Sequence, residues 1–389
     1  MTEQHSDDKV QAELLKKSIN DNFMEIEDPR RETSVTHRLI DIFFITICAI
    51  TSGANDLKAV AEYAKSKQGW LAKVLNLEHG VPSYNVLWLL FRMMNPDLLS
   101  EGFVRWMKSM TLQTNGETIA IDGKAQRGTA TDGDPNSFVH IVSAWAVHNQ
   151  LTLAQQKVDS KSNEITAIPK LLRLIDVSNS VVTIDAMGAQ TDIADQIISA
   201  GGDYIFSLKG NQGKLHDEII NYFDQALIYG DEGSEFTSSF TEETSHGRYE
   251  KREIFITNQI DFLPQKNLWK GLKMIVCIRS TRTYKDKTTV EKRYYVTSME
   301  ANAKDVSRHI RFHWGIENQA HWVLDVAYRE DRQRAKAGHI AENLSVMRRI
   351  SLNYLKQDAT VKAGIEIKRQ KAGWNESYLL RLLGVKSFS

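Results

Sequence analysis

Thr118-Ile-Ala-Ile-Asp122 and Val181-Val-Thr-Ile-Asp185 are two short apolar runs, each of which ends in an aspartate. Both runs predict β-strands, because β-branched residues are frequent in them. A third acid, Glu317, lies far downstream in a segment with helical spacing. Paired Mg²⁺ ions about 4 Å apart share hard oxygen ligands of this kind. The pattern therefore predicts an enzyme that cuts or joins phosphodiesters.

A single aspartate at the end of a strand is more often a turn residue or a helix cap. The order of the surrounding elements makes the case stronger. The predicted elements are strands at 118–122, 138–147 and 151–158, a helix within 163–176, a strand that ends at Asp185, a helix at 190–200 and a strand at 204–208. This order, β-β-β-α-β-α-β, is that of an RNase H-like core. In such a core the first and fourth strands are neighbours, so Asp122 and Asp185 are expected to meet.

Four motifs occur in the order typical of one bacterial family. They are Ile121-Asp122-Gly-Lys124, Ile184-Asp185-Ala-Met-Gly-Ala-Gln190, Leu208-Lys209-Gly-Asn211-Gln212 and His313-Trp314-Gly-Ile-Glu317-Asn318-Gln-Ala-His321-Trp322-Val-Leu-Asp325-Val. In these motifs, and from about residue 26 to about residue 355, the chain resembles insertion-sequence DDE transposases that include the H-repeat-associated proteins. The resemblance implies an α/β, RNase H-like catalytic core with a mainly β insertion before the Glu helix. It also implies an all-α, transposase-associated domain in front of that core.

The same resemblance implies that Asp122, Asp185 and Glu317 form an acidic triad. Related DDE transposases often carry a Tyr-Arg-Glu-Lys signature on the Glu helix. This chain keeps the Glu but has Ile310, His313 and Leu324 at the other three positions. The nearest basic candidates to hold the flanking phosphate are Arg311 and His313.

The expected function is metal-dependent DNA cleavage and strand transfer at the terminal repeats of a mobile element. The expected cofactor is Mg²⁺ or Mn²⁺, with two ions per active site held by Asp122, Asp185 and Glu317. The expected partners are double-stranded DNA, from the element ends and the target, and a second copy of the chain in the DNA complex. Two alternatives remain: a structure-specific nuclease on the same core, and a domesticated DNA-binding protein without turnover. A zinc site of His313, His321 and Glu317 ranks lower, because the aspartates favour Mg²⁺.

Candidate DNA contacts fall into three groups: side chains at the sheet edge, in the insertion and on the Glu helix. They are Lys124, Arg127, Lys209, Asn211 and Gln212 at the edge, His246, Arg248, Lys251 and Arg252 in the insertion, and Arg311, His313, Asn318 and His321 on the helix. The insertion group could instead form a solvated turn without DNA contact. Lys209 could likewise be a solvated surface lysine. Trp314 and Trp322 are expected to pack in the core. Glu330 and Asp331 are expected to form a charged surface or a subunit contact.

Charge is balanced over the 389 residues, with 49 basic and 49 acidic side chains. A nucleic-acid enzyme of this composition needs local basic patches. Residues 214–244 hold one Lys and eight acids, whereas residues 245–293 hold twelve Lys or Arg and five acids. The change of sign predicts a segment boundary, although solvated faces of ordinary surface elements explain it as well.

The chain contains two cysteines, both in apolar runs, so neither a disulfide framework nor a zinc site is expected. No signal peptide is visible, and the apolar run at 39–50 is shorter than the roughly 20 residues that span a bilayer. We therefore expect no membrane contact and a cytoplasmic, nucleoid-associated protein.

Five segments are expected. They are a mobile lead at 1–30, a helical domain at 31–112, the first part of the core at 113–213, a β-rich insertion at 214–300, and the Glu helix with C-terminal helices that complete the core at 301–389. In the helical domain, Ser83 is expected to cap a helix. This helix would belong either to a helix-turn-helix reader or to an ordinary packing module, and its apolar face favours the latter.

Overall fold

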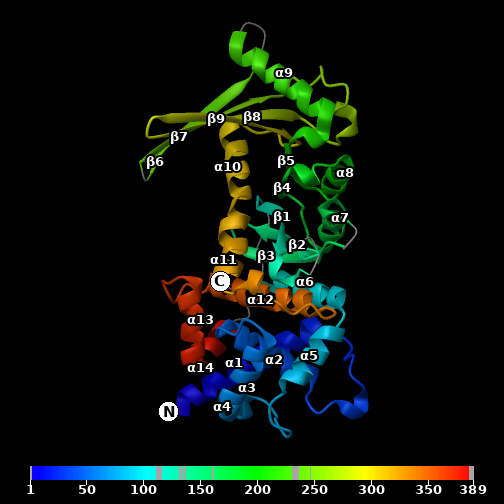
Figure 1. Cartoon of the computed structure of the whole chain (residues 1–389), viewed down its shortest axis with the longest axis vertical. Coiled ribbons are helices and arrows are strands. Elements are labelled where there is room, and N and C mark those ends of the chain that lie inside the picture. Colours follow the sequence, from blue (N-terminus) through cyan, green and yellow to red (C-terminus); the bar gives the residue numbers. More distant parts are fainter. Residues whose placement is uncertain are drawn as a thin grey trace.

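The computed structural model describes residues 2–110, 116–130, 134, 137–159, 162–229, 236–245 and 247–384. Three layers follow one another along the long axis of the molecule: helices at one end, a sheet flanked by helices in the middle, and a β-rich region with a long helix at the other end (Figure 1). No helix in the described residues is long and apolar enough to cross a membrane.

Within the described residues, nine strands form one mixed sheet in the order β3-β2-β1-β4-β5-β9-β8-β7-β6. The strands are β1 (Thr118–Gln126), β2 (Val139–Ala146), β3 (Leu151–Lys157), β4 (Val181–Ile184), β5 (Asp203–Leu208), β6 (Thr237–Ser245), β7 (Arg248–Thr257), β8 (Met274–Tyr284) and β9 (Lys287–Thr297). β1, β2 and β3 are antiparallel neighbours, whereas β4 runs parallel to β1 and β5 runs parallel to β4. This is the RNase H-like arrangement, and the fold class predicted from the order of the elements is confirmed.

Two groups of helices cover opposite faces of the core sheet. They are α7 (Glu164–Leu174), α8 (Thr191–Ser199) and α9 (Gly213–Tyr229) on one side, and α10 (Ala303–His313), the π-helical turn η6 (Glu317–His321) and α11 (Trp322–Val326) on the other. Side chains alternate along β1: Ile119 and Ile121 pack in the core with α7 and α8, and Ala120 packs against Ile316 and Ala320. Because strand side chains alternate with a period of two, Asp122 points to the same face as Ala120, toward the segment that carries Glu317.

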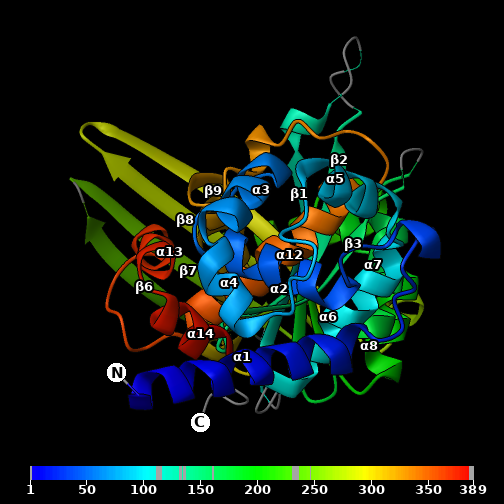
Figure 2. The same ribbon diagram turned by 90° about the horizontal axis from the view of Figure 1, so that it is seen from below.

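The helical layer is built from both ends of the chain (Figure 2). Its helices are α1 (Thr2–Phe23), α2 (Leu39–Thr51), α3 (Leu57–Ser66), α4 (Gln68–Val74), α5 (Tyr84–Met93), α6 (Pro96–Met110), α12 (Ile340–Gln357), α13 (Ile365–Trp374) and α14 (Glu376–Gly384). They share one hydrophobic core. Ser83 caps α5 as predicted, since its hydroxyl accepts a hydrogen bond from the Val86 amide at 3.4 Å.

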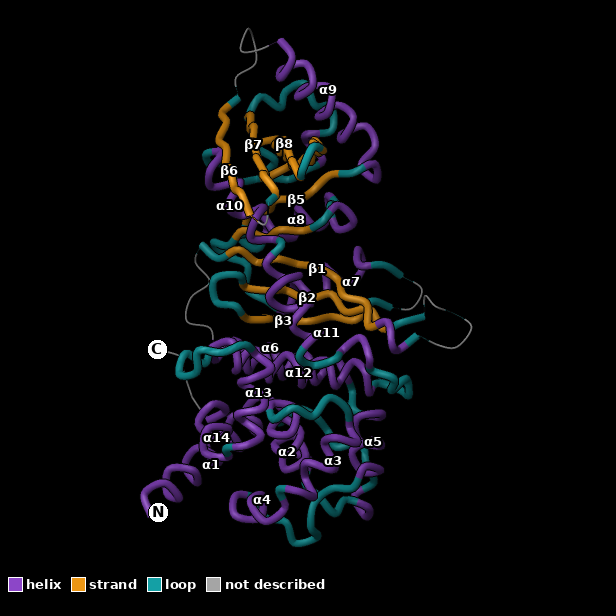
Figure 3. The backbone as a smooth tube through the Cα atoms, turned by 60° about the vertical axis from the view of Figure 1, so that its left-hand side comes forward, coloured by secondary structure: helices purple, strands orange, loops and turns teal. Residues whose placement is uncertain are grey.

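Two expectations about this layer differ from the structure. The segment 1–30 is no mobile lead: α1 buries Leu15, Ile19 and Phe23 and packs along α14 and α6. The C-terminal helices only partly complete the catalytic core. α12 lies between the layers and contacts β2 and β3, whereas α13 and α14 pack on α2 and α1 (Figure 3). Sequence order alone gave no sign that both chain ends meet in one domain.

The insertion contains two elements that the sequence analysis did not predict. β6 is an edge strand that is almost fully exposed, so it lacks the alternation of apolar and polar residues that identifies half-buried strands. α9 does show such a signal, because Leu215, Ile219 and Phe223 recur every four residues and are buried. Pro169 lies inside α7, as the sixth residue of this helix.

Candidate active site

Asp122 and Asp185 are brought together by the pairing of β1 and β4. The two strands are parallel, and Ile121 stands opposite Ile184, so each aspartate follows directly after a paired residue. Asp185 directly follows β4 and accepts a hydrogen bond from the Met187 amide at 3.0 Å, which fixes its side chain at the start of a 3-10 turn. Asp122 and Asp185 are therefore neighbours in the fold, as predicted.

Glu317 reaches the same place from the opposite side. It is the first residue of the π-helical turn η6, which continues the direction of α10. A cavity of about 570 Å³ is lined by all three acids. Its lining also includes Thr183, Ser207, Lys209, Gly210, His216, Glu291, Lys292, Arg293, Tyr294, Tyr295, His313 and Trp314. The same cavity is therefore lined by the three acids and by basic and aromatic side chains.

The electrostatics of Asp122 reflect this crowding. Burial raises the pKa of Asp122 to about 7, and the nearby charges of Glu164, Asp185 and Glu317 add to the rise, against a hydrogen bond from the Gly123 amide. A positive ligand placed between these carboxylates would relieve the repulsion. The donor chemistry fits Mg²⁺ or Mn²⁺, because the three acids supply hard oxygen atoms. In the described chain, however, no three Asp, Glu, His or Cys side chains converge closely enough to hold an ion, so the acids line the cavity without enclosing one point.

Two histidines pack beside the aspartates. His321 Nδ1 lies 3.5 Å from Asp122 Oδ2, and His321 Nε2 is buried without a hydrogen-bond partner in the described residues. Burial lowers the pKa of His321 to about 3. His313 Nδ1 lies 3.1 Å from Thr183 Oγ1, and burial lowers its pKa as well. A buried, neutral His321 ring does not attract phosphate, which argues against its expected DNA contact. His313 is half-buried and lines the cavity, so its expected DNA contact stays a prediction.

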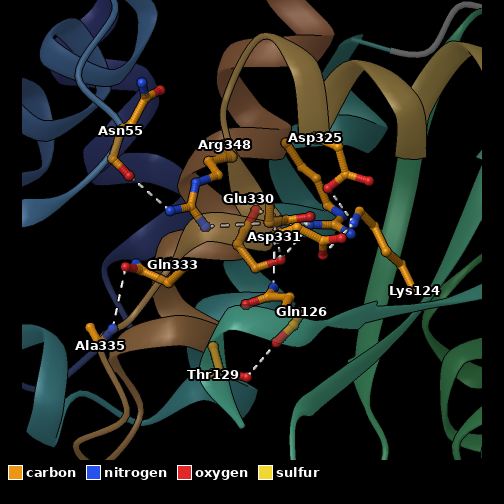
Figure 4. A network of polar contacts seen from close by, with 12 residues as sticks. Asn55, Lys124, Gln126, Thr129, Asp325, Glu330, Asp331, Gln333, Ala335 and Arg348 are labelled. Atoms are coloured by element: carbon orange, nitrogen blue, oxygen red, sulfur yellow. Dashed lines mark hydrogen bonds and ion pairs between the residues drawn. The ribbon is translucent and has the colours of Figure 1, made fainter.

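Lys124 has a structural role in place of the expected DNA contact. Its side chain is 6% exposed, and Nζ lies 2.5 Å from Asp325 Oδ1 and 3.2 Å from Asp331 Oδ1 (Figure 4). Asp325 belongs to α11, directly after the segment with Glu317. The ion pair therefore ties the strand of Asp122 to the helical segment of Glu317.

A buried charge cluster continues from this ion pair. Glu330 is fully buried, with its Oε1 at 3.3 Å from Arg349 Nη1 and 3.7 Å from Arg348 Nη1. Arg349 also donates to Ser143 on β2 at 3.2 Å, and Arg348 donates to the carbonyl of Asn55 in the helical layer at 2.9 Å. The expectation that Glu330 forms a charged surface was wrong, because the residue lies where the core meets the helical layer.

Asn211 and Gln212, two of the expected DNA contacts, bind the turn that follows Asp185, and Asn211 remains exposed, so the expected contacts stay predictions. Asn211 Nδ2 donates to the carbonyl of Ala186 at 2.6 Å, and Gln212 Nε2 donates to the carbonyl of Ala189. Both amides therefore hold the turn that follows Asp185. Lys209 is exposed at the cavity and remains a candidate for phosphate contact, as does the exposed Arg127.

The basic residues of the insertion are joined in ion pairs on its exposed hairpin. Arg252 Nη2 lies 2.7 Å from Glu250 Oε2, Lys251 Nζ lies 3.2 Å from Glu253 Oε1, and Arg248 Nη2 lies 3.6 Å from Glu250 Oε2. The side chain of Arg248 is 55% exposed. The fourth candidate of this group, His246, lies outside the described residues.

The Glu helix carries the last group of candidates. Arg311 is exposed along a groove between α10 and β6. Asn318 is exposed, and its Nδ2 donates to the carbonyl of Trp314 at 3.2 Å. Trp314 and Trp322 are 45% and 60% exposed, so the expectation that they pack in the core was wrong. Trp314 lines the cavity, and the Arg293 guanidinium lies 5.0 Å from its ring centre.

Sequence reasoning missed one acid that lies beside the aspartates, Glu164. It is the first residue of α7, where acids are common because the helix dipole favours them. Such a position carries no sign of a functional role. The available signal was the glycine next to Asp122, because a Cβ at position 123 would lie 2.1 Å from Glu164 Oε1.

Two protein-family sequence models match this chain. Residues 111–354 match the sequence model of a family described as "Transposase DDE domain", and residues 20–107 match one described as "DDE_Tnp_1-associated". The chain belongs to the DDE transposase family. The resemblance found in the four motifs is thereby confirmed.

Two of the relatives match almost the whole chain. "Putative transposase YncI" of Escherichia coli O157:H7 is 37% identical over 94% of this chain and 94% of its own length. "H repeat-associated putative transposase YhhI" of Escherichia coli K12 is 34% identical over 96% of this chain and 99% of its own length. "Inactive transposase YbfQ" of the same strain matches 60 residues at 30% identity. A solved piggyBac transposase synaptic complex with hairpin DNA overlaps 96% of this chain and 79% of its own, with a TM-score of 0.45 and 10% identity.

Proposed function

We propose that this DDE transposase family member cleaves DNA strands at the terminal repeats of a mobile element and joins the ends to target DNA, with Mg²⁺ or Mn²⁺ as cofactor. The observation that carries the proposal is that Asp122, Asp185 and Glu317 line one cavity although they come from three distant parts of the sequence. Burial, and after it the charges of nearby acids, raise the pKa of Asp122, and this supports the proposal because a divalent cation offsets repulsion between carboxylates.

Each acid has a distinct part in this proposal. The charges of both other acids act on Asp122, which is therefore the candidate to share two ions, while Asp185 and Glu317 would each complete one. Divalent cations held there would activate the attacking oxygen and stabilise the leaving oxygen of the phosphodiester. The chain itself fixes the three side chains: the Met187 amide holds Asp185, and the Lys124–Asp325 ion pair keeps the strand of Asp122 against the segment of Glu317.

Double-stranded DNA is the proposed substrate and partner. Lys209, Lys292 and Arg293 line the cavity together with the acids. Lys292 pairs with Asp224 and Arg293 pairs with Glu291, so the exposed Lys209 is the main candidate to meet a phosphate at the acids. The exposed ring of Trp314 offers a flat apolar surface in the same cavity. A second copy of the chain in the DNA complex remains part of the proposal, because two element ends must be held together for joining.

A strand-transfer assay tests this function. The protein is incubated with labelled double-stranded element ends, a supercoiled target plasmid and Mg²⁺ or Mn²⁺, and joined products are separated on gels. Joined products that require the metal support a transposase. Nicked ends without joining indicate a structure-specific nuclease, and bound but intact ends indicate a DNA-binding protein without turnover. Asp122→Asn serves as the control, since it removes the proposed shared ligand and keeps the side-chain volume.

A further inference from the structure

A second cavity, the junction cavity, lies where the helical layer meets the segment that follows the Glu helix. Its volume is about 650 Å³, and it is lined by the N-terminal parts of α3 and α5 and by residues 329–335. Its charged lining residues are four cations and one acid, namely Lys58, Arg329, Arg332, Arg334 and Asp56. The cavity therefore carries an excess of positive charge, although charge is balanced over the whole chain.

The four cations of the junction cavity are available to an anion. All four side chains are exposed, and within the described residues none of them forms an ion pair. Asp56 caps α3, where it accepts a hydrogen bond from the Ala59 amide at 2.8 Å. By contrast, the basic side chains of the insertion hairpin pair with Glu250 and Glu253. Exposed, unpaired cations that line one cavity attract a polyanion.

The segment that carries the three arginines is firmly anchored. Glu330 is fully buried and Gln333 is 5% exposed (Figure 4), whereas Arg329, Arg332 and Arg334 between and beside them are exposed. Arg329 has φ 52° and ψ 38°, a left-handed conformation that is uncommon for residues other than glycine. Such a conformation persists only where the surrounding contacts fix it, and here the buried ion pairs of Glu330 do so. The arginines therefore have defined positions at the cavity.

The junction cavity lies beyond the same end of the sheet as the catalytic acids. β1 and β4 are parallel, and Asp122 and Asp185 lie toward their C-terminal ends. The turn η2 (Arg127–Thr129) directly follows β1 and packs on η7 (Glu330–Arg332), which borders the cavity. Arg127 follows Asp122 by five residues, which corresponds to roughly 17 Å along a strand and to about five base pairs of DNA. A duplex that ends at the acids can therefore run past η2 to the junction cavity.

We propose that the junction cavity binds the phosphate backbone of double-stranded DNA, at base pairs inside the element end whose terminal phosphate lies at the acids. This inference rests on the proposed function, because the acids define where the end of the duplex lies. Guanidinium groups bind phosphate oxygens with paired hydrogen bonds, and Lys58 adds a point charge from α3. Contacts of this kind fix the position of a duplex without reading its sequence. The helical layer and the core would thus hold the same DNA in register for cleavage.

A second copy of the chain is the competing partner. Residues 214–244 hold eight acids and one lysine, which is a surface that the arginines could bind instead of DNA. The two partners differ in their consequences: loss of a subunit contact changes the oligomeric state, whereas loss of a DNA contact does not.

The chain offers a matched control for the loss of two positive charges. Lys108 lies in the last turn of α6 and Arg173 in the last turn of α7, and both are exposed. These helices precede β1 and β4 in the sequence, so their last turns lead to the starts of the two strands, at the opposite end from the acids. Replacement of both residues therefore removes the same charge away from the proposed DNA path.

DNA binding by the full-length protein tests the proposal. A fluorescent duplex of about 30 base pairs, cut at the boundary of the element that encodes the protein, is titrated without divalent metal at several salt concentrations. The proteins are the wild type, the double variant Arg332→Gln with Arg334→Gln, Lys58→Gln, and the control Lys108→Gln with Arg173→Gln. We expect the double variant to bind about tenfold more weakly or worse, with a salt slope lower by about two. Lys58→Gln should lower the slope by about one, and the control should bind as the wild type does.

Neutral methylphosphonate groups locate the contact on the DNA. In the wild type, neutral groups placed more than about five base pairs inside the element boundary should weaken binding. The same groups should cause no further loss in the Arg332→Gln, Arg334→Gln variant, because the contact is already absent. Additive losses in protein and DNA would overturn the inference.

The other outcomes separate this inference from the proposed function. Wild-type affinity and salt slope in the double variant overturn the inference, as does an equal loss in the control variant. A changed oligomeric state at unchanged DNA affinity, measured by sedimentation, assigns the cavity to a second copy and also overturns it. If the double variant loses affinity but the wild type never cleaves with Mg²⁺ or Mn²⁺, the cavity binds DNA and the proposed chemistry is wrong. Should the double variant not fold, Lys58→Gln decides, and wild-type affinity and slope in it overturn the inference.

Discussion

Lys124 and Asp325 form an ion pair, with 2.5 Å between Nζ and Oδ1, that joins the strand of Asp122 to the helix that follows Glu317. The two residues are 201 positions apart in the sequence. Their contact fixes the distance between two of the three proposed metal ligands, because each ligand is close in sequence to one partner of the pair. The lysine of the Ile-Asp-Gly-Lys motif therefore acts within the protein.

Replacing Lys124 by Met should destabilise the fold without reducing contact with DNA phosphates. Removal of one partner from a buried ion pair costs about 3–5 kcal/mol, and partial exposure of Asp325 and Asp331 should lower this to about 2 kcal/mol. Urea denaturation measures the change in unfolding free energy. Lys209→Met, at an exposed lysine, is the control and should leave stability unchanged. A Lys124→Met variant that is fully stable but binds DNA with a shallower salt dependence would return Lys124 to the DNA contacts.

The raised pKa of Asp122 predicts how stability without metal depends on pH. The pKa is about 7 in the folded protein and near 3.8 in the unfolded chain, so the folded state binds the proton more tightly. The contribution of Asp122 to stability is therefore present below about pH 4 and is lost as pH rises toward 7. Asparagine cannot ionise, so the Asp122→Asn variant avoids this loss of stability at high pH. The variant should have a higher melting temperature than the wild type at pH 8 and a similar one at pH 4. The shift corresponds to at most about 4 kcal/mol. Equal melting differences at both pH values would contradict the assignment.

Metal binding should restore the stability that the metal-free protein loses when Asp122 is ionised. At a concentration of Mg²⁺ or Mn²⁺ about 100 times the dissociation constant, binding to the folded state alone stabilises it by about 2.7 kcal/mol. We expect a higher melting temperature with metal for the wild type and no metal-induced change for Asp122→Ala. A shift of wild-type size in Asp122→Ala would place the metal elsewhere in the protein.

The exposed hairpin of the insertion is another candidate for a general DNA contact. Joint replacement of Arg248, Lys251 and Arg252 by Ala should weaken binding to all DNA and make the salt dependence shallower by up to about three phosphate equivalents. Because these residues pair with Glu250 and Glu253, a smaller change is expected if the ion pairs persist in the complex. Filter binding over a range of salt concentrations measures both quantities. If the triple variant binds DNA with wild-type affinity and an unchanged salt dependence, Lys209 and Arg127 remain candidate DNA contacts.

Much of the core could be predicted from the sequence, because its strands alternate or are continuously apolar and its helices begin and end at recognisable residues. The neighbourhood of Asp122 and Asp185 followed from the order of the elements alone. The contacts that the basic and polar motif residues make within the protein did not follow from this order, because they depend on tertiary packing. Lys124, Asn211 and Gln212 have the composition of a phosphate site, but they turn toward Asp325 and the turn after Asp185.

Other parts were hidden for different physical reasons. Glu164 was missed because an acid in the first turn of a helix is an ordinary feature, and only its packing on Gly123 sets it apart. The exposure of Trp314 and Trp322 was missed because aromatic residues on an amphipathic helix usually face the core. The meeting of α1 with α14 depends on tertiary packing between distant ends of the chain.

The central claim is that Asp122, Asp185 and Glu317 perform metal-dependent chemistry on phosphodiesters. The most direct measurement maps cleaved phosphates, at nucleotide resolution, on the ends of the element that encodes the protein, for the wild type, Asp185→Asn and Glu317→Gln. We predict a single cleaved phosphate at the element boundary for the wild type with Mg²⁺. For both variants we predict rates lower by several orders of magnitude, at nearly unchanged DNA affinity, because metal ligands are removed and phosphate contacts remain. Cleavage at the same phosphate and rate by either variant would contradict the account.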